Sequence, residues 1–259
     1  MKLAILSDIH GNLLALQAVL ADVALQDVDQ ILNLGDIASG PLQPAETLDL
    51  LMTYNFLTIA GNHERQLLTL MAQANEPSDP TTSDGYAASQ LNPAHTAWLQ
   101  ALPVSLELME GEVLLCHGTP DSDLQYWLET VVRGYTAGSH SGVRAAMAQE
   151  VAQRLGSVNH SLVLCGHTHV PRVVQSGGSL IVNPGSVGLQ AYDGVHPWLH
   201  HIETGAPQAR YALAESGPAG WQITLRQVPY DHLTQAEVAR RNGRPDWAHA
   251  LATGWVLPL

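Results

Sequence analysis

Short apolar segments alternate with helical patterns in the N-terminal part of the chain, and this alternation limits the fold more than any other feature. Residues 2–6, 29–36 and 56–62 are typical of buried strands, whereas residues 12–25 and 43–54 carry apolar side chains at helical spacing. Strands that are joined by helices form βαβ units, in which consecutive strands run parallel. The pattern therefore predicts an α/β protein.

The remainder of the chain is predicted to add both helices and strands to this unit. The segments at about 64–102 and 121–155 are interpreted as helical and cap-like, the second as two helices, within a single domain of residues 1–259. Asn92 followed by Pro93 is typical of a helix start. Further strands are predicted at 104–108, 112–118, 161–167, 180–186, 209–215 and 221–230, and helices at 234–243 and 245–254. These patterns leave two architectures open, one mixed sheet or two sheets packed together.

The charge balance limits the partners of the protein. The chain has 24 Asp and Glu against 11 Lys and Arg, a formal net charge of −13, and Lys2 is its single lysine. An extended nucleic-acid or anionic-membrane surface needs clustered positive charge, so neither is expected. The apolar run before Ser7 is too short for a signal peptide or a membrane span. We therefore expect a cytoplasmic protein with a small substrate, and leave open whether it forms a homo-oligomer.

Polar side chains follow several predicted strands at the point where each strand ends. They are Asp8, His10, Asp36, Asn62, His117, His167 and His169. Sites gather at the carboxyl ends of strands in α/β sheets, and the glycines beside these residues permit sharp turns. His167 and His169 project to one side of an extended chain, which suits a divalent metal or a polyanion. Together these residues predict one metal centre.

Five short motifs carry a resemblance to a known family. In chain order they are DIHGN, LGDIASGP, GNHER, CHGTP and GHTHVP. They resemble the blocks of the calcineurin-like metallophosphoesterase superfamily, and NPGSVG at 183–188 is similar to a segment of its small bacterial and archaeal phosphodiesterases. The resemblance implies a four-layer α/β-β/α sandwich, in which two mixed β-sheets lie face to face and helices flank them.

The resemblance also implies a ligand set for two divalent metal ions. One ion would be held by Asp8, His10, Asp36 and His169, and the other by Asp36, Asn62, His117 and His167. Asp36 would then bridge the two ions. The mixture of nitrogen and oxygen ligands suits Mn²⁺, Fe, Zn²⁺ or Ni²⁺, with Mn²⁺ expected first, and argues against Ca²⁺ or Mg²⁺ alone.

Such a centre predicts a phosphoesterase. Two metal ions about 3.5–4 Å apart hold the attacking and leaving oxygens of an in-line displacement, and a hydroxide that they share is a nucleophile near neutral pH. We expect hydrolysis of small phosphodiesters or phosphomonoesters, with cyclic nucleotides among the candidates. The resemblance implies that His63 steadies the phosphate and acts as general acid, and a purely structural histidine is the alternative.

Other candidate residues have two interpretations each. Asn12 is expected to touch a phosphate oxygen or to shape the turn after the first strand. Arg65 is expected to contact substrate or to lie on a helix surface, and Asn62 is assigned to substrate as well as to metal. Tyr126 and Trp127 are expected to stack on a substrate ring or to pack in the core.

Two other functions compete with hydrolysis of small esters. Protein phosphatases and dinucleoside tetraphosphate hydrolases of this superfamily extend the second motif to G-D-x-V-D-R-G, whereas this chain has Ser39-Gly40 at the Asp-Arg positions. A catalytically silent scaffold would have no physical reason to keep four imidazoles around two carboxylates. Both alternatives are therefore less favoured. Residues 190–259 carry no pattern that assigns them a role.

Overall fold

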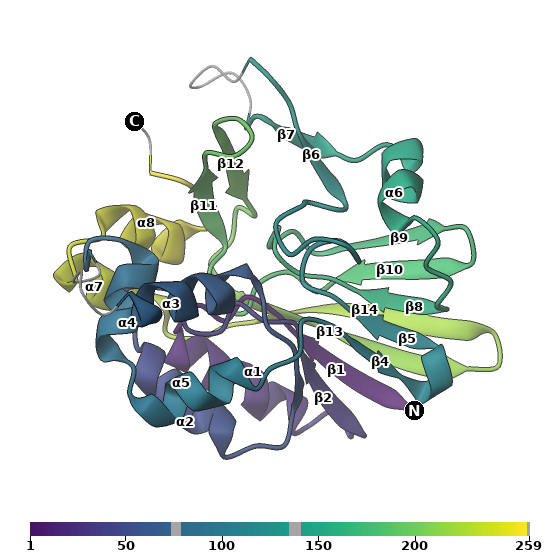
Figure 1. Cartoon of the computed structure of the whole chain (residues 1–259), viewed down its shortest axis with the longest axis horizontal. Coiled ribbons are helices and arrows are strands. Elements are labelled where there is room, and N and C mark those ends of the chain that lie inside the picture. The colour runs from purple at the N-terminus through teal and green to yellow at the C-terminus, as the bar shows by residue number, and fades with distance from the viewer. Residues whose placement is uncertain (74–78, 135–140, 258–259) are drawn as a thin grey trace.

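The computed structural model describes residues 1–73, 79–134 and 141–257, and it contains two five-stranded sheets (Figure 1). The strands of the first sheet are β1 (Lys2–Leu6), β2 (Gln30–Asn33), β3 (Leu57–Thr58), β13 (Ala209–Gly217) and β14 (Gly220–Val228). The strands of the second sheet are β4 (Leu106–Leu108), β5 (Val113–Leu115), β8 (Leu162–Leu164), β9 (Arg172–Ser176) and β10 (Ser179–Asn183). Two hairpins stand apart from these sheets: β6 (Glu129–Val131) with β7 (Val143–Ala145), and β11 (Ala191–Gly194) with β12 (His200–Glu203).

Helices flank both sheets. They are α1 (Leu13–Val23), α2 (Pro44–Met52), α3 (Asn62–Ala72), α4 (Ser83–Gln90), α5 (Pro93–Gln100), α6 (Ala148–Leu155), α7 (His232–Arg241) and α8 (Pro245–Thr253), with a short 3₁₀ helix at Met109–Gly111. In Figure 1, α1, α2 and α5 lie beside the first sheet and α6 lies beside the second. The pair α7 and α8, drawn in yellow, lies together near the hairpin β11–β12.

Both sheets are mixed. The first has the order β14-β13-β1-β2-β3, in which β1, β2 and β3 run parallel, β13 pairs antiparallel with β1, and β14 pairs antiparallel with β13. The second has the order β4-β5-β8-β10-β9, in which β5, β8 and β10 run parallel and the edge strands β4 and β9 are antiparallel. The parallel strands place their carboxyl ends at one edge of each sheet, which is where the predicted ligands follow.

The apolar run of β1 serves two cores at once. Leu3 and Ile5 pack in the core between the sheets, whereas Ala4 and Leu6 pack toward the helices of the first sheet. Successive side chains of a strand point to opposite faces, so a strand that is buried on both faces needs a continuous apolar run. This explains why residues 2–6 show no polar alternation.

The second sheet repeats this arrangement. Leu115 of β5 faces the core between the sheets, while its neighbour Leu114 packs with Val163 in a separate core that includes Val151 and Leu155 of α6. The layers are therefore helix, sheet, sheet and helix. The predicted sandwich of two mixed sheets flanked by helices is confirmed.

The interpretation of residues 121–155 as two helices is wrong. The described part of this segment forms the hairpin β6–β7 and one helix, α6. Thr130, Val131 and Val132 are consecutive β-branched residues, which are restricted in a helix and fit a pleated strand. Residues 135–140 of this segment, and residues 74–78 of the segment at 64–102, lie outside the described residues. The described part of 64–102 is helical, as predicted.

The two cysteines and the cap of α5 agree with the sequence-based expectations, whereas three strands were not expected. Cys116 and Cys165 are buried free cysteines at the ends of β5 and β8, as expected. The side chain of Asn92 caps α5 by accepting hydrogen bonds from the next turn. Strands β9, β11 and β12 were not predicted. Within the described ranges, no helix has the length and apolar content needed to cross a membrane.

Candidate metal centre

The predicted ligands meet at the carboxyl ends of strands from both sheets. Asp8 and His10 follow β1, Asp36 follows β2, and His117 and His167 follow β5 and β8. Hydrogen bonds join the two sheets at this point, because the peptide nitrogen of His167 donates to the Asp8 carboxylate and that of Gly188, which follows β10, donates to the Asp8 carbonyl. The site therefore lies where the two sheets meet, which separates its ligands widely along the chain.

Two groups of side chains within the described residues have the arrangement of metal ligands. The first consists of Asp8, His10 and His169, and the second of Asp36, His117 and His167. In each group, one ligand atom from every residue lies within 4.8 Å of the others. The structure thus brings together six of the seven predicted ligands as two adjacent triads.

Three of the histidines are held in one tautomer by backbone carbonyls. Nδ1 of His10 donates to the Ser39 carbonyl at 2.8 Å, Nδ1 of His169 to the Leu189 carbonyl at 2.7 Å, and Nδ1 of His117 to the Leu34 carbonyl at 2.7 Å. A carbonyl can only accept, so Nδ1 must carry the proton.

The neutral form of each of these rings therefore directs the lone pair of Nε2 into the site, which is the arrangement that metal-binding histidines need.

The lone pairs face each other and the carboxylates. Nε2 of His10 lies 3.1 Å from Nε2 of His169, and Nε2 of His117 lies 3.0 Å from an Asp36 oxygen. In the neutral tautomer such contacts are repulsive, because neither atom has a proton to share. A bound cation, or a proton, relieves this repulsion. His167 differs, since its Nε2 donates to a backbone carbonyl, that of Leu124, and Nδ1 remains as its ligand atom.

Burial and neighbouring charges set the ionisation of the site. Burial and the nearby His169 lower the pKa of His10 to about 3, and burial with the nearby His117 lowers the pKa of His167 to about 4. Both rings are thereby kept neutral, the form that binds metal. Burial opposes a charge on His117, but the Asp36 carboxylate raises the His117 pKa to about 10. The Asp36 carboxylate that stabilises a proton on His117 would stabilise a metal cation at the same place.

The ligand residues themselves adopt strained backbone conformations. Asp8, His10, Asp36, His167 and His169 have φ values of 55°, 53°, 54°, 67° and 59°. Residues other than glycine rarely occupy this left-handed region, and each such conformation costs about 1–3 kcal/mol. The neighbouring glycines were expected to form the sharp turns, but much of the backbone strain lies on the five candidate ligands themselves.

Glu64 is a buried residue at the candidate site that the sequence did not identify. Its fully buried carboxylate accepts hydrogen bonds from the backbone nitrogens of Asp36, Ile37 and Gly61, at 2.7, 2.8 and 2.8 Å. Burial and the nearby Asp36 raise the pKa of Glu64, and the three backbone donors oppose this. Glu64 ties the loop after β2 to the start of α3. Its place in the GNHER motif was the available signal, but no role was assigned to it.

Asp84 is a second residue that the sequence did not identify. Nδ1 of His63 donates to Asp84 Oδ1 at 2.8 Å, and the backbone nitrogen of His63 donates to Asp36 at 2.9 Å. Burial opposes a charge on His63, but Asp36 and Asp84 raise the His63 pKa to about 9. The bond to Asp84 leaves Nε2 of His63 as its remaining nitrogen. Asp84 lies in α4, 21 residues further along the chain, so no local motif reveals the contact.

The remaining candidates separate into those at the site and those away from it. Asn62 is buried, and its side-chain oxygen has no hydrogen-bond partner within the described structure. Asn12 is fully buried, caps α1 and donates to the Gly188 carbonyl, which favours its turn-shaping interpretation. Arg65 is an exposed helix residue that pairs with Asp123, which favours the surface interpretation.

Tyr126 and Trp127 lie in different environments, the first in a pocket and the second in the core. Trp127 is 1% exposed and packs in the core beside α6, as one of the two interpretations predicted. Tyr126 lines a pocket beside the candidate metal centre, and its hydroxyl lies 2.6 Å from that of Tyr192 and 3.0 Å from Nε2 of His200. Tyr192 of the hairpin β11–β12 lines the same pocket.

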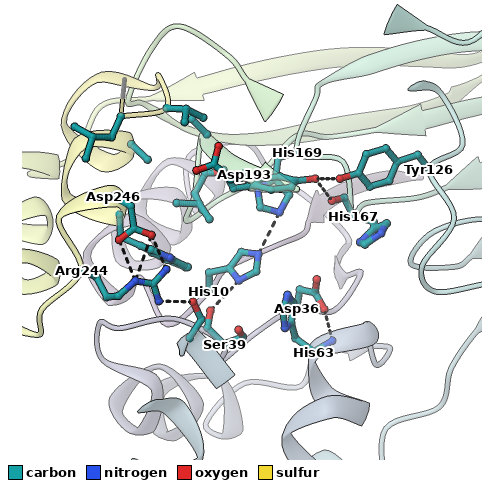
Figure 2. Close-up of a pocket in the computed structure, with 18 residues that line it drawn as sticks. His10, Asp36, Ser39, His63, Tyr126, His167, His169, Asp193, Arg244 and Asp246 are labelled. Carbon is teal, nitrogen blue, oxygen red and sulfur yellow. Dashed lines mark hydrogen bonds and ion pairs between the residues drawn. The ribbon is translucent and has the colours of Figure 1, made fainter. Parts of the chain in front are cut away.

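A pocket of about 330 Å³ opens from the candidate metal centre (Figure 2). His10, Asp36, His63 and His169 line one end of it. In Figure 2, the labelled side chains of the motifs converge from one side, and Arg244 with Asp246 stands on the other. A pocket of this size suits a small molecule.

Comparisons with known proteins agree with this geometry. The family described as "Calcineurin-like phosphoesterase superfamily domain" matches residues 1–205. The structure of a metallophosphoesterase from Sphaerobacter thermophilus is 26% identical, with a TM-score of 0.73 over 98% of this chain and 99% of that one. A hypothetical protein of Pyrococcus horikoshii shares the fold at 16% identity, with a TM-score of 0.71 over 98% of each chain. An uncharacterized protein of Methanocaldococcus jannaschii is 25% identical over 95% of this chain and 94% of its own length.

Proposed function

Because the chain belongs to the calcineurin-like phosphoesterase superfamily of metal-dependent phosphoric ester hydrolases, we propose that it hydrolyses small phosphodiesters or phosphomonoesters at a centre of two divalent ions. Mn²⁺ is the first candidate ion, followed by Fe, Zn²⁺ and Ni²⁺, because these ions accept mixed imidazole and carboxylate ligands. The whole chain is proposed to act as one domain.

One observation carries the proposal. The Nε2 atoms of His10 and His169 lie 3.1 Å apart, while both Nδ1 atoms donate to backbone carbonyls. Two neutral imidazoles in this arrangement direct lone pairs at the same point. Only a positive charge between them makes the contact favourable, and a divalent ion supplies it without protonating either ring. The donor set therefore fits a metal ion.

Different residues of the chain are proposed to hold the two ions and to donate the proton. Asp8, His10 and His169 would hold one ion, and Asp36, His117 and His167 the other. Asp36 is proposed to reach both ions, and the unpartnered oxygen of Asn62 to complete the second set. When bound, two such ions polarise the phosphoryl group and lower the pKa of water. Nε2 of His63, oriented through Nδ1 by Asp84, is proposed to give its proton to the leaving oxygen.

The pocket favours a small ester over a phosphorylated protein. Its volume is about 330 Å³, and residues of β11 and α8 form one of its walls. A phosphorylated side chain that is still attached to a protein needs an open approach for its backbone. The proposed substrates are therefore free small molecules, in agreement with Ser39-Gly40 in the second motif.

The direct test is hydrolysis by metal-stripped protein to which Mn²⁺, Zn²⁺, Ni²⁺ and Mg²⁺ are returned singly. Bis-p-nitrophenyl phosphate reports on diesters, and p-nitrophenyl phosphate reports on monoesters. We expect metal-dependent release of p-nitrophenolate, with Mn²⁺ most effective. Failure of every ion to restore hydrolysis of both esters, in protein that binds two equivalents, would contradict the proposal.

We expect His63→Ala to keep both metal ions and to lose rate. General acids typically contribute about 10²–10⁴-fold to rate, so esters of poor leaving groups should lose that much. Esters of p-nitrophenol should lose far less, because this leaving group departs without a proton. The measurement is kcat for a series of aryl diesters of increasing leaving-group pKa, together with the metal content of each protein.

Asp84→Asn is the matched variant for this experiment. An amide at this position can still hydrogen-bond His63, but it removes the negative charge beside the ring. We expect a loss in the same direction as His63→Ala and smaller than it, with unchanged metal content. A loss of rate that is the same for every leaving group would contradict proton donation by His63.

A further inference from the structure

The pocket continues away from the candidate metal centre along a wall that later parts of the chain build (Figure 2). This C-terminal wall consists of Ala191 and Asp193 of β11, Trp247 and Ala250 of α8, and Leu257 after that helix. Neither candidate ligand group includes any of the five. The wall therefore faces the site without holding metal.

Trp247 connects the C-terminal wall to the metal centre. Its ring centroid lies 5.9 Å from that of His10, with the rings nearly perpendicular at 76°. The indole also packs so closely on Gly40 that a Cβ there would lie 2.9 Å from the ring. The indole is thus fixed between the loop after β2 and the pocket, within reach of a group attached to a phosphate at the centre.

The pocket is open in front of this wall because two of the side chains that line it are alanines. Ala191 and Ala250 are 1% and 3% exposed and both line the pocket. Trp247 and Ala250 are three residues apart in α8 and therefore share one face of the helix. Leu189 and Leu257 add further apolar surface. A larger side chain at either alanine would fill part of the cavity.

The charges of the wall disfavour further phosphate groups. Arg244 is the single Arg or Lys among the lining residues that the structure describes, and Asp246 already binds it in bidentate fashion at 2.9 and 2.6 Å. Its remaining nitrogen Nη1 donates to Ser83. Asp193 adds a second carboxylate, which pairs with His201. A second phosphate at this wall would face the carboxylates of Asp193 and Asp246. The single cationic side chain of the wall, Arg244, is already paired with Asp246.

We propose that the C-terminal wall is a subsite for the organic group of the ester, and that it selects a compact apolar or aromatic group without further phosphate. The inference rests on the proposed function, because it assumes that a phosphate ester is bound at the metal centre. Apolar contacts, and the ring of Trp247 in particular, supply the affinity. Asp193 and Asp246 reject polyanionic groups by like-charge repulsion.

Binding of two phosphonates tests the subsite without turnover. Calorimetry on metal-loaded protein compares phenylphosphonate with methylphosphonate, which differ in the organic group alone. We expect the phenyl compound to bind at least about tenfold more tightly, as a filled apolar pocket does. Ala250→Leu should abolish this preference, because its side chain takes the place of the ring. Ala252→Leu, in the same helix but outside the lining, is the control and should keep it.

Kinetics with p-nitrophenyl diesters extend the test to substrates. The second alcohol is methanol, phenol or an alkyl alcohol that carries a phosphate. We expect wild-type kcat/KM to be highest for the phenyl diester and lowest for the phosphate-bearing one. Ala250→Leu should lower kcat/KM for the phenyl diester at least about tenfold and for the methyl diester less than about threefold.

The outcomes separate the two proposals. Ala191→Val narrows the same cavity from β11 and should reproduce the selective loss, even if Ala250→Leu folds poorly. Equal losses on methyl and phenyl diesters in both variants, or no loss in either, would overturn the subsite. A phosphate-bearing diester that matches the phenyl diester would overturn its selectivity. If wild-type protein hydrolyses neither diesters nor monoesters with any metal, the proposed function fails instead, and the phosphonate preference still decides whether the wall binds a ring.

Discussion

Asp36→Asn is expected to lose both metal ions and nearly all activity. One oxygen of Asp36 lies 3.0 Å from Nε2 of His117, and the other accepts from the backbone nitrogen of His63 at 2.9 Å. The amide keeps the size of the side chain and one acceptor, so the fold should survive. It removes one of the two carboxylates in the centre and directs an amide group at a cationic position.

The size of this effect follows from the position of the residue. Replacing a partner of a metal ligand typically costs about 10–100-fold in metal affinity, and replacing a ligand that serves two ions should cost at least the upper end of that range. Metal equivalents after gel filtration and kcat/KM on bis-p-nitrophenyl phosphate are the measurements. Asp121→Asn, at an exposed position, is the control and should retain both. Two full equivalents in Asp36→Asn would falsify the shared-ligand assignment.

Glu64→Ala is expected to destabilise the fold itself. The substitution leaves the backbone nitrogens of Asp36, Ile37 and Gly61 buried without an acceptor. A buried donor that loses its partner costs about 1–3 kcal/mol, so the free energy of unfolding should fall by about 3 kcal/mol or more. The loop that presents Asp36 should loosen as well, which would weaken metal binding. Urea unfolding in the presence of chelator measures the first effect apart from the second.

Two further variants serve as controls for the urea unfolding of Glu64→Ala. Glu64→Gln keeps one acceptor oxygen in the same place and should lose less stability than Glu64→Ala. Glu46→Ala removes an exposed carboxylate from α2 and should change the unfolding free energy by less than about 0.5 kcal/mol. A Glu64→Ala protein that unfolds at the wild-type urea concentration would show that water or backbone movement satisfies the three donors.

The strand ends and the residues that meet at the candidate site could be predicted because they carry local signals. A continuous apolar run such as residues 2–6 identifies a strand that is buried on both faces, and the polar residue after it marks the edge where parallel strands end. The structure of the segment 121–155, interpreted as two helices, could not be predicted correctly in the same way. Its β-branched residues at 130–132 compete with a helical pattern nearby, and pairing between β6 and β7 decided the outcome.

The sequence by itself determined which side chains meet at the candidate metal centre, since each of them lies in a short motif that follows a strand. The tertiary structure alone decided how these ligands are oriented and what surrounds them. Glu64, Asp84 and Trp247 act on groups that lie far away in the chain, or that belong to other elements. Such contacts leave no periodic pattern, because packing between distant elements sets them. For the same reason, the C-terminal wall could not be predicted from the sequence, since it depends on the packing of Trp247 of α8 against Gly40 in the loop after β2.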